Sequence, residues 1–403
     1  MKYLIMLGDG MADYPIPQLG EKTPLQVAKK PNMDFLAQNG ISGLVRTVPE
    51  GMTPGSDTAN LSVMGYDPKI YYTGRSPLEA ISMGIAMAPE DIAFRCNLVT
   101  LSDEPDYAAK TMVDYSSDEI STTESIQLVN FLAEHFNNQT LQFYPGISYR
   151  HCLVYRGGET GTIMTPPHDI TTQKVTGHLP TGVYGGQLLK LMKESYTLLK
   201  DHPVNVERVK QGLNPANSCW FWGEGRKPAL TSFEERFGLK GAVISAVDLI
   251  KGIAICADME SINVIGATGN IHTNFKGKGE AALAAFDRGI DYVYIHVEAP
   301  DESGHRNELE NKILSIEKID AEILGPIMAG LKERGEDYRI LLLPDHGTPL
   351  ALRTHVGDPV PFSLYDSRSK NPNNAAAYDE ESAAQTGVFV AEGHRLIEDL
   401  LKN

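Results

Sequence analysis

The sequence predicts a doubly wound α/β protein into which a smaller α+β domain is inserted. Along most of the 403 residues, short unbroken apolar runs alternate with helical patterns. Such runs are typical of parallel strands that are buried on both faces of a sheet. In the middle third, strand-like runs follow one another with few helices between them, which is typical of a small α+β module. At about 150 residues per domain, the length is sufficient for two or three domains.

The α/β core is predicted from its helices and from the apolar runs between them. One helix is expected over residues 31–38, with Pro31 at its first position and Gly40 just past its end. Two more are expected over residues 280–287 and 308–334, the latter interrupted at Gly325 and Pro326. The expected strands of the core are residues 3–7, 261–265, 292–297 and 339–343.

The inserted domain is predicted to cover residues 85–180, so that residues 1–84 and 181–403 together form the catalytic domain. Within the insert we expect a helix over 123–136 and strands over 141–144 and 149–155. The helical pattern at 185–200 is assigned to the core. Residues 371–387, rich in Asn, Ala and acidic side chains, are expected to form a surface loop.

Composition limits the classes of partner. The chain has 36 basic and 52 acidic residues, a formal charge of −16, which argues against a broad basic face for nucleic acid. An anionic substrate would need local Arg or Lys clusters, or metal ions. The four cysteines show no CxxC spacing, and no apolar run approaches the ~18 residues of a membrane span. We therefore expect a soluble, cytoplasmic protein without a membrane partner; a homo-oligomer is allowed but not required.

Three aspartates follow predicted core strands closely: Asp9, Asp301 and Asp345. In open α/β sheets, ligands bind beyond the carboxyl ends of the strands, so these side chains are expected to converge. A single Asp after a strand is more often a helix N-cap or a turn former. Three of them at equivalent strand ends favour a shared site.

Three histidines accompany these aspartates: His305, His346 and His355. Six carboxylate and imidazole ligands suit two divalent ions rather than one. Oxygen and nitrogen donors without thiolate favour Mn²⁺, Mg²⁺, Co²⁺ or Zn²⁺ over soft metals, and we expect Mn²⁺. His296, inside a predicted strand, is interpreted as a core residue.

Ser56 is the candidate nucleophile. It lies in the segment 53–60, where a Pro-Gly turn leads into a helical pattern, so its hydroxyl is expected at a helix start that favours anions. A serine in this position is usually only an N-cap. A metal ion beside the hydroxyl would lower its pKa and make it a nucleophile near neutral pH. Thr53 and Thr58 are weaker alternatives.

Several motifs in order resemble a known family. They are LGDGMADYP, TPGSDTANLSVMGYDP, YTGRSPLEA, VEAPDESGH, PDHGT and THVGDPVP. Together they resemble the archaeal-type, cofactor-independent (2,3-bisphosphoglycerate-independent) phosphoglycerate mutases of the alkaline phosphatase superfamily. The resemblance implies an alkaline-phosphatase-like, mostly parallel α/β domain interrupted by a substrate-binding cap domain. It also implies interconversion of 3-phosphoglycerate and 2-phosphoglycerate in glycolysis and gluconeogenesis, with a small phosphorylated hydroxy acid as substrate.

The resemblance also implies roles for individual residues. Ser56 would be phosphorylated transiently. One metal would be held by Asp301, His305 and His355. The other would be held by Asp9, Asp345, His346 and the oxygen of Ser56.

The substrate carboxylate and phosphate need fixed donors, for which bidentate Arg is well suited. Arg75 is the candidate on the core side. Lys276 and Lys278 are alternatives to one another. The candidates on the inserted domain are Arg150, His151, His168 and Asp169. Each Arg or Lys taken alone could equally well be a solvated surface charge.

Other functions remain open at this point. A phosphatase, phosphodiesterase or phosphopentomutase could use the same scaffold, because metal ligands do not set specificity. No Cys-x-Pro-x-Arg segment is present for a sulfatase. A homoserine-kinase-like enzyme would need a nucleotide site, but Asp13 occupies the last glycine position of GxGxxG. A non-catalytic binding protein would be expected to have lost a ligand or the nucleophile, and all of them are present.

Overall fold

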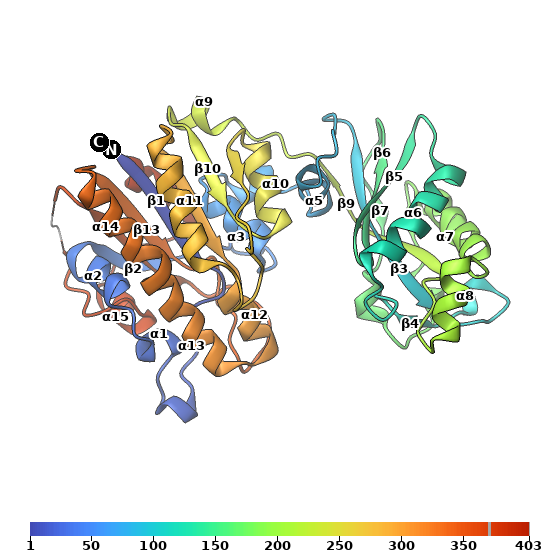
Figure 1. Ribbon diagram of the computed structural model, residues 1–403, viewed down its shortest axis with the longest axis horizontal. Helices are drawn as coiled ribbons and strands as arrows, with labels where there is room; N and C mark the ends of the chain where they lie inside the picture. Colours follow the sequence, from blue (N-terminus) through green and yellow to red (C-terminus); the bar gives the residue numbers. More distant parts are fainter. Residues whose placement is uncertain (370–371, 403) are drawn as a thin grey trace. The chain divides into compact units, whose positions relative to one another are not determined.

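The computed structural model describes residues 1–369 and 372–402 (Figure 1). The chain divides into two compact units. Unit 1 comprises Met1–Tyr72 and Ala229–Asn403, and unit 2 comprises Thr73–Pro228. In the part of the chain that the structure describes, no helix combines the length and apolarity that crossing a membrane requires.

Unit 1 is built on an eight-stranded, mostly parallel sheet. Five neighbouring strands of the sheet, β11, β10, β12, β1 and β13, run parallel to one another. Strand β14 is antiparallel to both of its neighbours, β13 and β2. Residues of the central strand β1 are buried on both faces, as expected for a parallel sheet covered by helices. In spatial order the strands are β11 (Glu260–Ile262), β10 (Gly241–Ile244), β12 (Tyr292–Val297), β1 (Lys2–Gly8), β13 (Tyr338–Leu343), β14 (Val360–Asp366), β2 (Ile41–Val45) and β15 (Phe389–Val390).

Helices cover both faces of this sheet. One face packs Met6, Ile295 and Leu342 against α2 (Pro31–Asn39), α11 (Phe275–Asp287) and the helical segment that ends in α14. The predicted helix at 308–334 is observed as α13 (Leu309–Lys318), a π-helical turn (Ile319–Leu324) and α14 (Gly325–Glu333), with Pro326 in the first turn of α14. On the other face lie α3 (Ser56–Val63) and α10 (Asp248–Cys256), which contact each other.

Unit 2 is an α+β unit around an antiparallel sheet. In that sheet β3 pairs with β4, β6 and β9, and β5 pairs with β6. Its apolar core includes residues of β3 and of the helices α6 and α7. The elements are β3 (Ile92–Leu101), β4 (Met112–Asp114), α6 (Thr122–Phe136), β5 (Leu141–Ile147), β6 (Arg150–Tyr155), α7 (Gly185–Leu199), α8 (Pro203–Lys210) and β9 (Ser218–Arg226).

The boundaries of unit 2 differ from the predicted 85–180. Strand β9 pairs along β3, which brings the chain up to residue 228 into this unit. The helical pattern at 185–200, assigned to the core from the sequence, is α7 and packs against β9. At the other end, α5 (Ser76–Ser82) contacts both β3 and β9. Arg75, expected on the core side, therefore belongs to unit 2.

The segment 371–387 is not simply a surface loop. It contains the helix α15 (Glu380–Gln385), and Ala375 and Tyr378 are buried. The backbone N–H of Tyr378 donates to Oδ1 of Asp34 (2.9 Å), which ties this segment to α2. Asn371, the first residue of the expected loop, lies outside the described residues.

Candidate metal centre

The candidate metal ligands lie at the carboxyl ends of three adjacent strands. Asp9 follows β1, Asp345 follows β13, and Asp301 lies in the first turn of α12 (Ala299–Arg306), directly after β12. Strand β1 is parallel to both β12 and β13, so their carboxyl ends meet at one edge of the sheet. The topology thus brings together residues that are separated by more than 300 positions in the chain.

One potential metal-binding group comprises Asp9, Asp345 and His346. Nε2 of His346 lies 3.6 Å from Oδ1 of Asp9 and 3.4 Å from Oδ2 of Asp345. All three side chains are buried. Burial lowers the pKa of His346, which favours the neutral imidazole that a metal requires.

The second group comprises Asp301, His305 and His355. Nε2 of His305 lies 3.3 Å from Oδ2 of Asp301, and Nε2 of His355 lies 3.4 Å from Oδ1. The two Nε2 atoms are 2.9 Å apart. His346 also lies close to Asp301 and His355, so the two groups adjoin. These distances are compatible with the ligand sets implied by the family resemblance.

Ser56 is the first residue of α3, and its hydroxyl points into this centre. Its Oγ lies 3.5 Å from Oδ2 of Asp9 and 3.2 Å from Nε2 of His346. Gly55 precedes it as the N-cap residue and provides no side-chain cap. Thr58, a weaker alternative from the sequence, is buried and donates to the carbonyls of Thr53 and Gly55 (3.3 and 3.1 Å). Its hydroxyl is therefore engaged in the turn.

Asp345 is held by donors on both of its oxygens. Oδ1 accepts from the backbone N–H groups of Gly10 (3.2 Å) and His346 (2.9 Å), and Oδ2 accepts from Nδ2 of Asn60 (2.8 Å). Gly10 has φ +63°, and a Cβ there would lie 2.8 Å from Oδ1 of Asp301. Glycine is therefore needed for this close approach.

Asn60 was missed by the sequence analysis. Its side-chain amide also donates to the Ser56 carbonyl (2.8 Å), and its Oδ1 accepts from the hydroxyl of Tyr294 (2.5 Å) on β12. The amide therefore fixes the start of α3 relative to Asp345 and the sheet. The spacing Ser56–Asn60, one turn of helix, is the only sequence signal for it.

The electrostatics of the three carboxylates indicate whether divalent cations fit this centre. Burial, together with Asp345 and Asp301, raises the pKa of Asp9 well above its usual range. Oδ1 of Asp9 is buried without a hydrogen-bond partner among the described residues. Three buried carboxylates in one small volume are unfavourable without positive charge. Oxygen and imidazole ligands in this arrangement fit divalent metals.

His296 lies beside this centre, although its place in a strand suggested a core residue. Its Nε2 is 3.0 Å from Oδ2 of Asp9, and its Nδ1 is 3.3 Å from Oγ of Ser245. Burial lowers the pKa of His296 to about 4, so the ring is neutral at pH 7. The interpretation of His296 as a core residue is correct for its burial, but it did not anticipate the contact with Asp9.

The two candidate lysines occupy different environments. Nζ of Lys278 is buried and donates to the carbonyl of His296 (2.9 Å), and burial lowers its pKa to about 8. Lys276 is exposed and pairs with Glu280 (3.4 Å). Of the two, Lys278 is the one beside the metal centre.

Unit 2 carries a cluster of cationic and aromatic side chains: Arg75 directly before α5, Arg95 in β3, Trp222 in β9, and His168. Nε of Arg75 and Nε of Arg95 lie 2.7 and 2.9 Å from the two carboxylate oxygens of Glu79. The Arg95 guanidinium stacks 4.1 Å from the ring of Trp222, which also contacts His168 (5.2 Å between ring centroids). Burial lowers the pKa of Arg95, and the nearby positive charges of Arg75 and Arg150 add to this effect. Arg95 was missed by the sequence analysis.

Two of the predicted substrate-binding residues, His151 and Asp169, have other partners. His151 is buried and pairs with Cys96 on β3, whose side chain lies in the apolar core of unit 2. Its Nδ1 accepts from the N–H of Gly146 (2.9 Å), and burial lowers its pKa to about 3. Asp169 is exposed, with Oδ1 3.6 Å from Nε2 of His168. A neutral, buried His151 is poorly suited to binding an anion.

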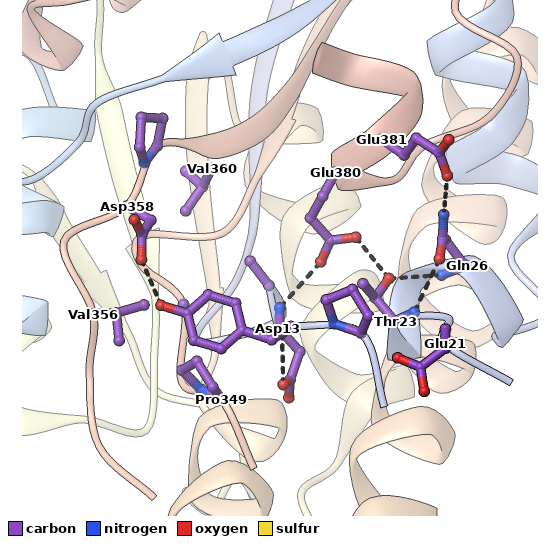
Figure 2. A pocket seen from close by; sticks show the side chains of 15 residues that line it. Asp13, Glu21, Thr23, Gln26, Pro349, Val356, Asp358, Val360, Glu380 and Glu381 are labelled. Carbon is purple, nitrogen blue, oxygen red and sulfur yellow. Dashed lines mark hydrogen bonds between the residues drawn. The ribbon is translucent and has the colours of Figure 1, made fainter. Parts of the chain in front are cut away.

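A separate cavity of about 470 Å³ lies in unit 1 beside the segments that follow His346 and His355 (Figure 2). Its wall includes Asp13 and Glu380; Oε1 of Glu380 accepts from the Asp13 N–H (3.1 Å). Asp13 also accepts a hydrogen bond from Nζ of the buried Lys312 (2.7 Å), which donates to the Thr348 carbonyl as well (2.8 Å). Among its described lining residues are none of the candidate metal ligands. The cavity is thus distinct from the centre, but its wall braces the loops that carry Asp9 and His346.

The fold and this centre define a class of α/β protein in which a helix-terminal serine adjoins buried groups that fit divalent metals. A model of one family, described as 2,3-bisphosphoglycerate-independent phosphoglycerate mutase, matches residues 37–205. A relative from Geobacter sulfurreducens, named probable 2,3-bisphosphoglycerate-independent phosphoglycerate mutase, is 52% identical over 100% of both chains. A relative from Methanosarcina barkeri that carries this family name is 47% identical, again over 100% of both chains.

Solved structures agree with this assignment. A Pyrococcus horikoshii protein matches with a TM-score of 0.84 and 29% identity, over 99% of this chain and 96% of that one. The cofactor-independent phosphoglycerate mutase of Thermoplasma acidophilum matches with a TM-score of 0.68 and 26% identity, over 100% and 99%. The chain belongs to the 2,3-bisphosphoglycerate-independent phosphoglycerate mutase family, as the motifs predicted.

Proposed function

We propose that this protein is a metal-dependent phosphoglycerate mutase that interconverts 3-phosphoglycerate and 2-phosphoglycerate through phosphoserine at Ser56. The observation that carries the proposal is the position of Oγ of Ser56, 3.2 Å from Nε2 of His346 and 3.5 Å from Oδ2 of Asp9. Family membership supports the substrate, and a glycolytic and gluconeogenic role in the cytoplasm follows from it. The mixed oxygen and nitrogen ligands support Mn²⁺ as the ion.

The reaction divides into two displacements at phosphorus. Oγ of Ser56 forms a bond to phosphorus while the bond from phosphorus to the substrate oxygen breaks, and the proton lost by the serine hydroxyl is balanced by the proton that this oxygen takes up. The other hydroxyl of glycerate then attacks the phosphoserine and restores the serine hydroxyl. Divalent cations at the two ligand groups would lower the pKa of the serine hydroxyl and offset negative charge on the transferred group.

Glycerate must stay bound between the two steps, because water would otherwise hydrolyse the phosphoserine. We propose that unit 2 is the substrate-binding domain and that its arginine cluster binds the anionic groups of the substrate. Arg75 and Arg95 share Glu79 and are held in defined orientations, which suits bidentate contacts with carboxylate or phosphate. Lys278 is a further candidate from unit 1.

An enolase-coupled assay with 3-phosphoglycerate, without added 2,3-bisphosphoglycerate, tests this function. We expect turnover that requires Mn²⁺ and is abolished by Ser56→Ala. Ser62→Ala is the matched control, because Ser62 lies on the same helix and its buried Oγ has no hydrogen-bond partner among the described residues. Turnover by Ser56→Ala at the parent rate would refute the phosphoserine step.

The same assay separates the alternatives. Release of inorganic phosphate without 2-phosphoglycerate would indicate a phosphatase on this scaffold. ATP-dependent phosphorylation of homoserine would indicate a kinase. Either result would leave the proposed metal centre in place and change the reaction assigned to it.

A further inference from the structure

The two innermost carboxylates of the centre differ in how they are held. Asp345 accepts three hydrogen bonds, which fix both of its oxygens. Asp9 accepts only a long contact from Ser56 (3.5 Å), and its Oδ1 has no partner among the described residues. Two imidazoles also lie close to this carboxylate: Nε2 of His296 is 3.0 Å from Oδ2, and Nε2 of His346 is 3.6 Å from Oδ1.

His296 is part of a row of side chains across three parallel strands. In the registers of β10 with β12 and of β12 with β1, Ile244 lies opposite Ile295, and Leu7 lies opposite His296. Ser245 therefore lies beside His296 on one side. On the other side, Asp9 follows Leu7 by two residues and so projects from the same face of the sheet. Ser245, His296 and Asp9 thus form a lateral row at the carboxyl ends of the strands.

The hydrogen-bonding capacities in this row assign the proton on His296. Oγ of Ser245 already accepts from the N–H of Val247 (3.0 Å), and its own hydrogen is free to point at Nδ1 of His296, 3.3 Å away. Asp9 is ionised when it binds a cation, and an ionised carboxylate oxygen can only accept, so in that state the nitrogen that faces Asp9 carries the hydrogen. The Asp9 end therefore favours the Nε2–H tautomer, and the Ser245 hydroxyl can match it by donating to Nδ1.

We propose that His296 is a positioning residue for Asp9: its Nε2–H donates to Oδ2 and leaves Oδ1 as the oxygen that faces the cation. The two atoms are 3.0 Å apart, but Nε2 has no hydrogen-bond partner among the described residues, so the proposed bond requires the two side chains to align. Because hydrogen-bonded partners of metal ligands fix the ligand orientation, this contact supports metal affinity. The inference rests on the proposed role of Asp9 as a metal ligand.

Mn²⁺ titration of the full-length protein tests the inference. His296→Leu removes the donor at similar volume, and we expect it to weaken binding at one of the two sites about 10–100-fold. His296→Gln keeps an N–H near the position of Nε2, and we expect it to restore most of that affinity. Wild-type affinity in His296→Leu, or equal losses in the two variants, would overturn the proposal.

Two further measurements separate the possible failures. Asp9→Asn, titrated in parallel, must itself weaken Mn²⁺ binding; if it does not, the metal role of Asp9 fails, whatever His296 does. Histidine ¹⁵N shifts of the wild-type protein loaded with diamagnetic Zn²⁺, assigned by comparison with His296→Gln, report the tautomer directly. We expect the proton on Nε2. A proton on Nδ1 would overturn the proposal even if His296→Leu fails to fold.

Discussion

The centre of unit 1 and the cluster of unit 2 carry opposite charge. In unit 1, three buried carboxylates converge at strand ends, and the buried Oδ1 of Asp9 has no hydrogen-bond partner among the described residues. In unit 2, Arg75 and Arg95 share a single glutamate beside Trp222. The first arrangement suits cations and the second suits anions. In the proposed function, these local charges would let a chain of net charge −16 act on an anionic substrate.

The two sites also differ in how the fold forms them. The unit 1 centre uses loops after parallel strands, where the topology alone brings the side chains together. The unit 2 cluster uses β3 and β9, whose antiparallel register places Arg95 opposite Trp222. We therefore expect substitutions in unit 1 to change metal binding, and substitutions in unit 2 to change substrate binding without changing metal binding.

Removal of metal should have the largest effect. We expect a chelator to lower mutase turnover about a thousandfold or more, because metal ions contribute several kcal/mol to transition-state stabilisation and each 1.36 kcal/mol is tenfold in rate. Enolase-coupled rates before and after readdition of Mn²⁺ measure this loss. The enolase must be supplied with its own Mg²⁺ after quenching, so that the coupling enzyme is not the one inhibited. Unchanged turnover in the metal-free protein would remove the role assigned to unit 1.

Arg95→Met should have the next largest effect. Loss of a charged hydrogen bond costs about 1.5–3 kcal/mol, so we expect kcat/KM to fall about 10–100-fold while Mn²⁺ affinity stays unchanged. Arg95→Lys keeps the charge but not the planar donor geometry, and it should recover only part of the loss. Arg288→Met, which removes an exposed arginine paired with Glu260 in unit 1, is the control. Weaker Mn²⁺ binding by Arg95→Met would contradict the separation of the two sites.

Metal affinity should depend on pH. Hydrogen bonding to Asp301 raises the pKa of His305 to about 9 in the metal-free protein, so the ring is protonated below that pH. A metal binds the neutral ring, and binding therefore releases this proton. We expect the release of this proton to raise Mn²⁺ affinity by up to about tenfold per pH unit, and this contribution to level off near pH 9. Calorimetry of Mn²⁺ binding in two buffers of different ionisation enthalpy counts the protons released. Binding to His305→Gln should release one proton fewer than binding to the wild-type protein.

The lysine pair should give the smallest effect. Lys278→Met removes a buried amino group beside the centre, and we expect kcat/KM to fall about tenfold, the value of one modest charged contact. Lys276→Met removes an exposed group paired with Glu280 and should leave the rate unchanged. Steady-state kinetics of the two variants, measured side by side, checks this assignment. A lower kcat/KM in Lys276→Met than in Lys278→Met would contradict it.

The sequence was sufficient to predict the central strands and the convergence of Asp9, Asp301 and Asp345, because an acidic residue after an unbroken apolar run marks a strand end. It was not sufficient for His296, since a histidine inside an apolar strand has the same pattern whether it faces core or carboxylate. Arg95 and Asn97 alternate with apolar residues in β3, which was a usable signal for polar contacts on one face of this sheet.

The boundary of unit 2 and the segment after residue 371 could not be predicted for a different reason. Both depend on contacts between distant parts of the chain: β9 with β3, and Tyr378 with Asp34. Local patterns carry no information about such pairings. The helix α7 is amphipathic in either unit, so its periodicity could not assign it to one of them.

A crystal structure of the Mn²⁺-loaded protein, with manganese located by anomalous scattering, tests the central claim most directly. We expect two ions: one among Asp301, His305 and His355, and one bound by Asp9, Asp345, His346 and Oγ of Ser56. A single ion, or two ions with Ser56 outside their coordination, would contradict the account.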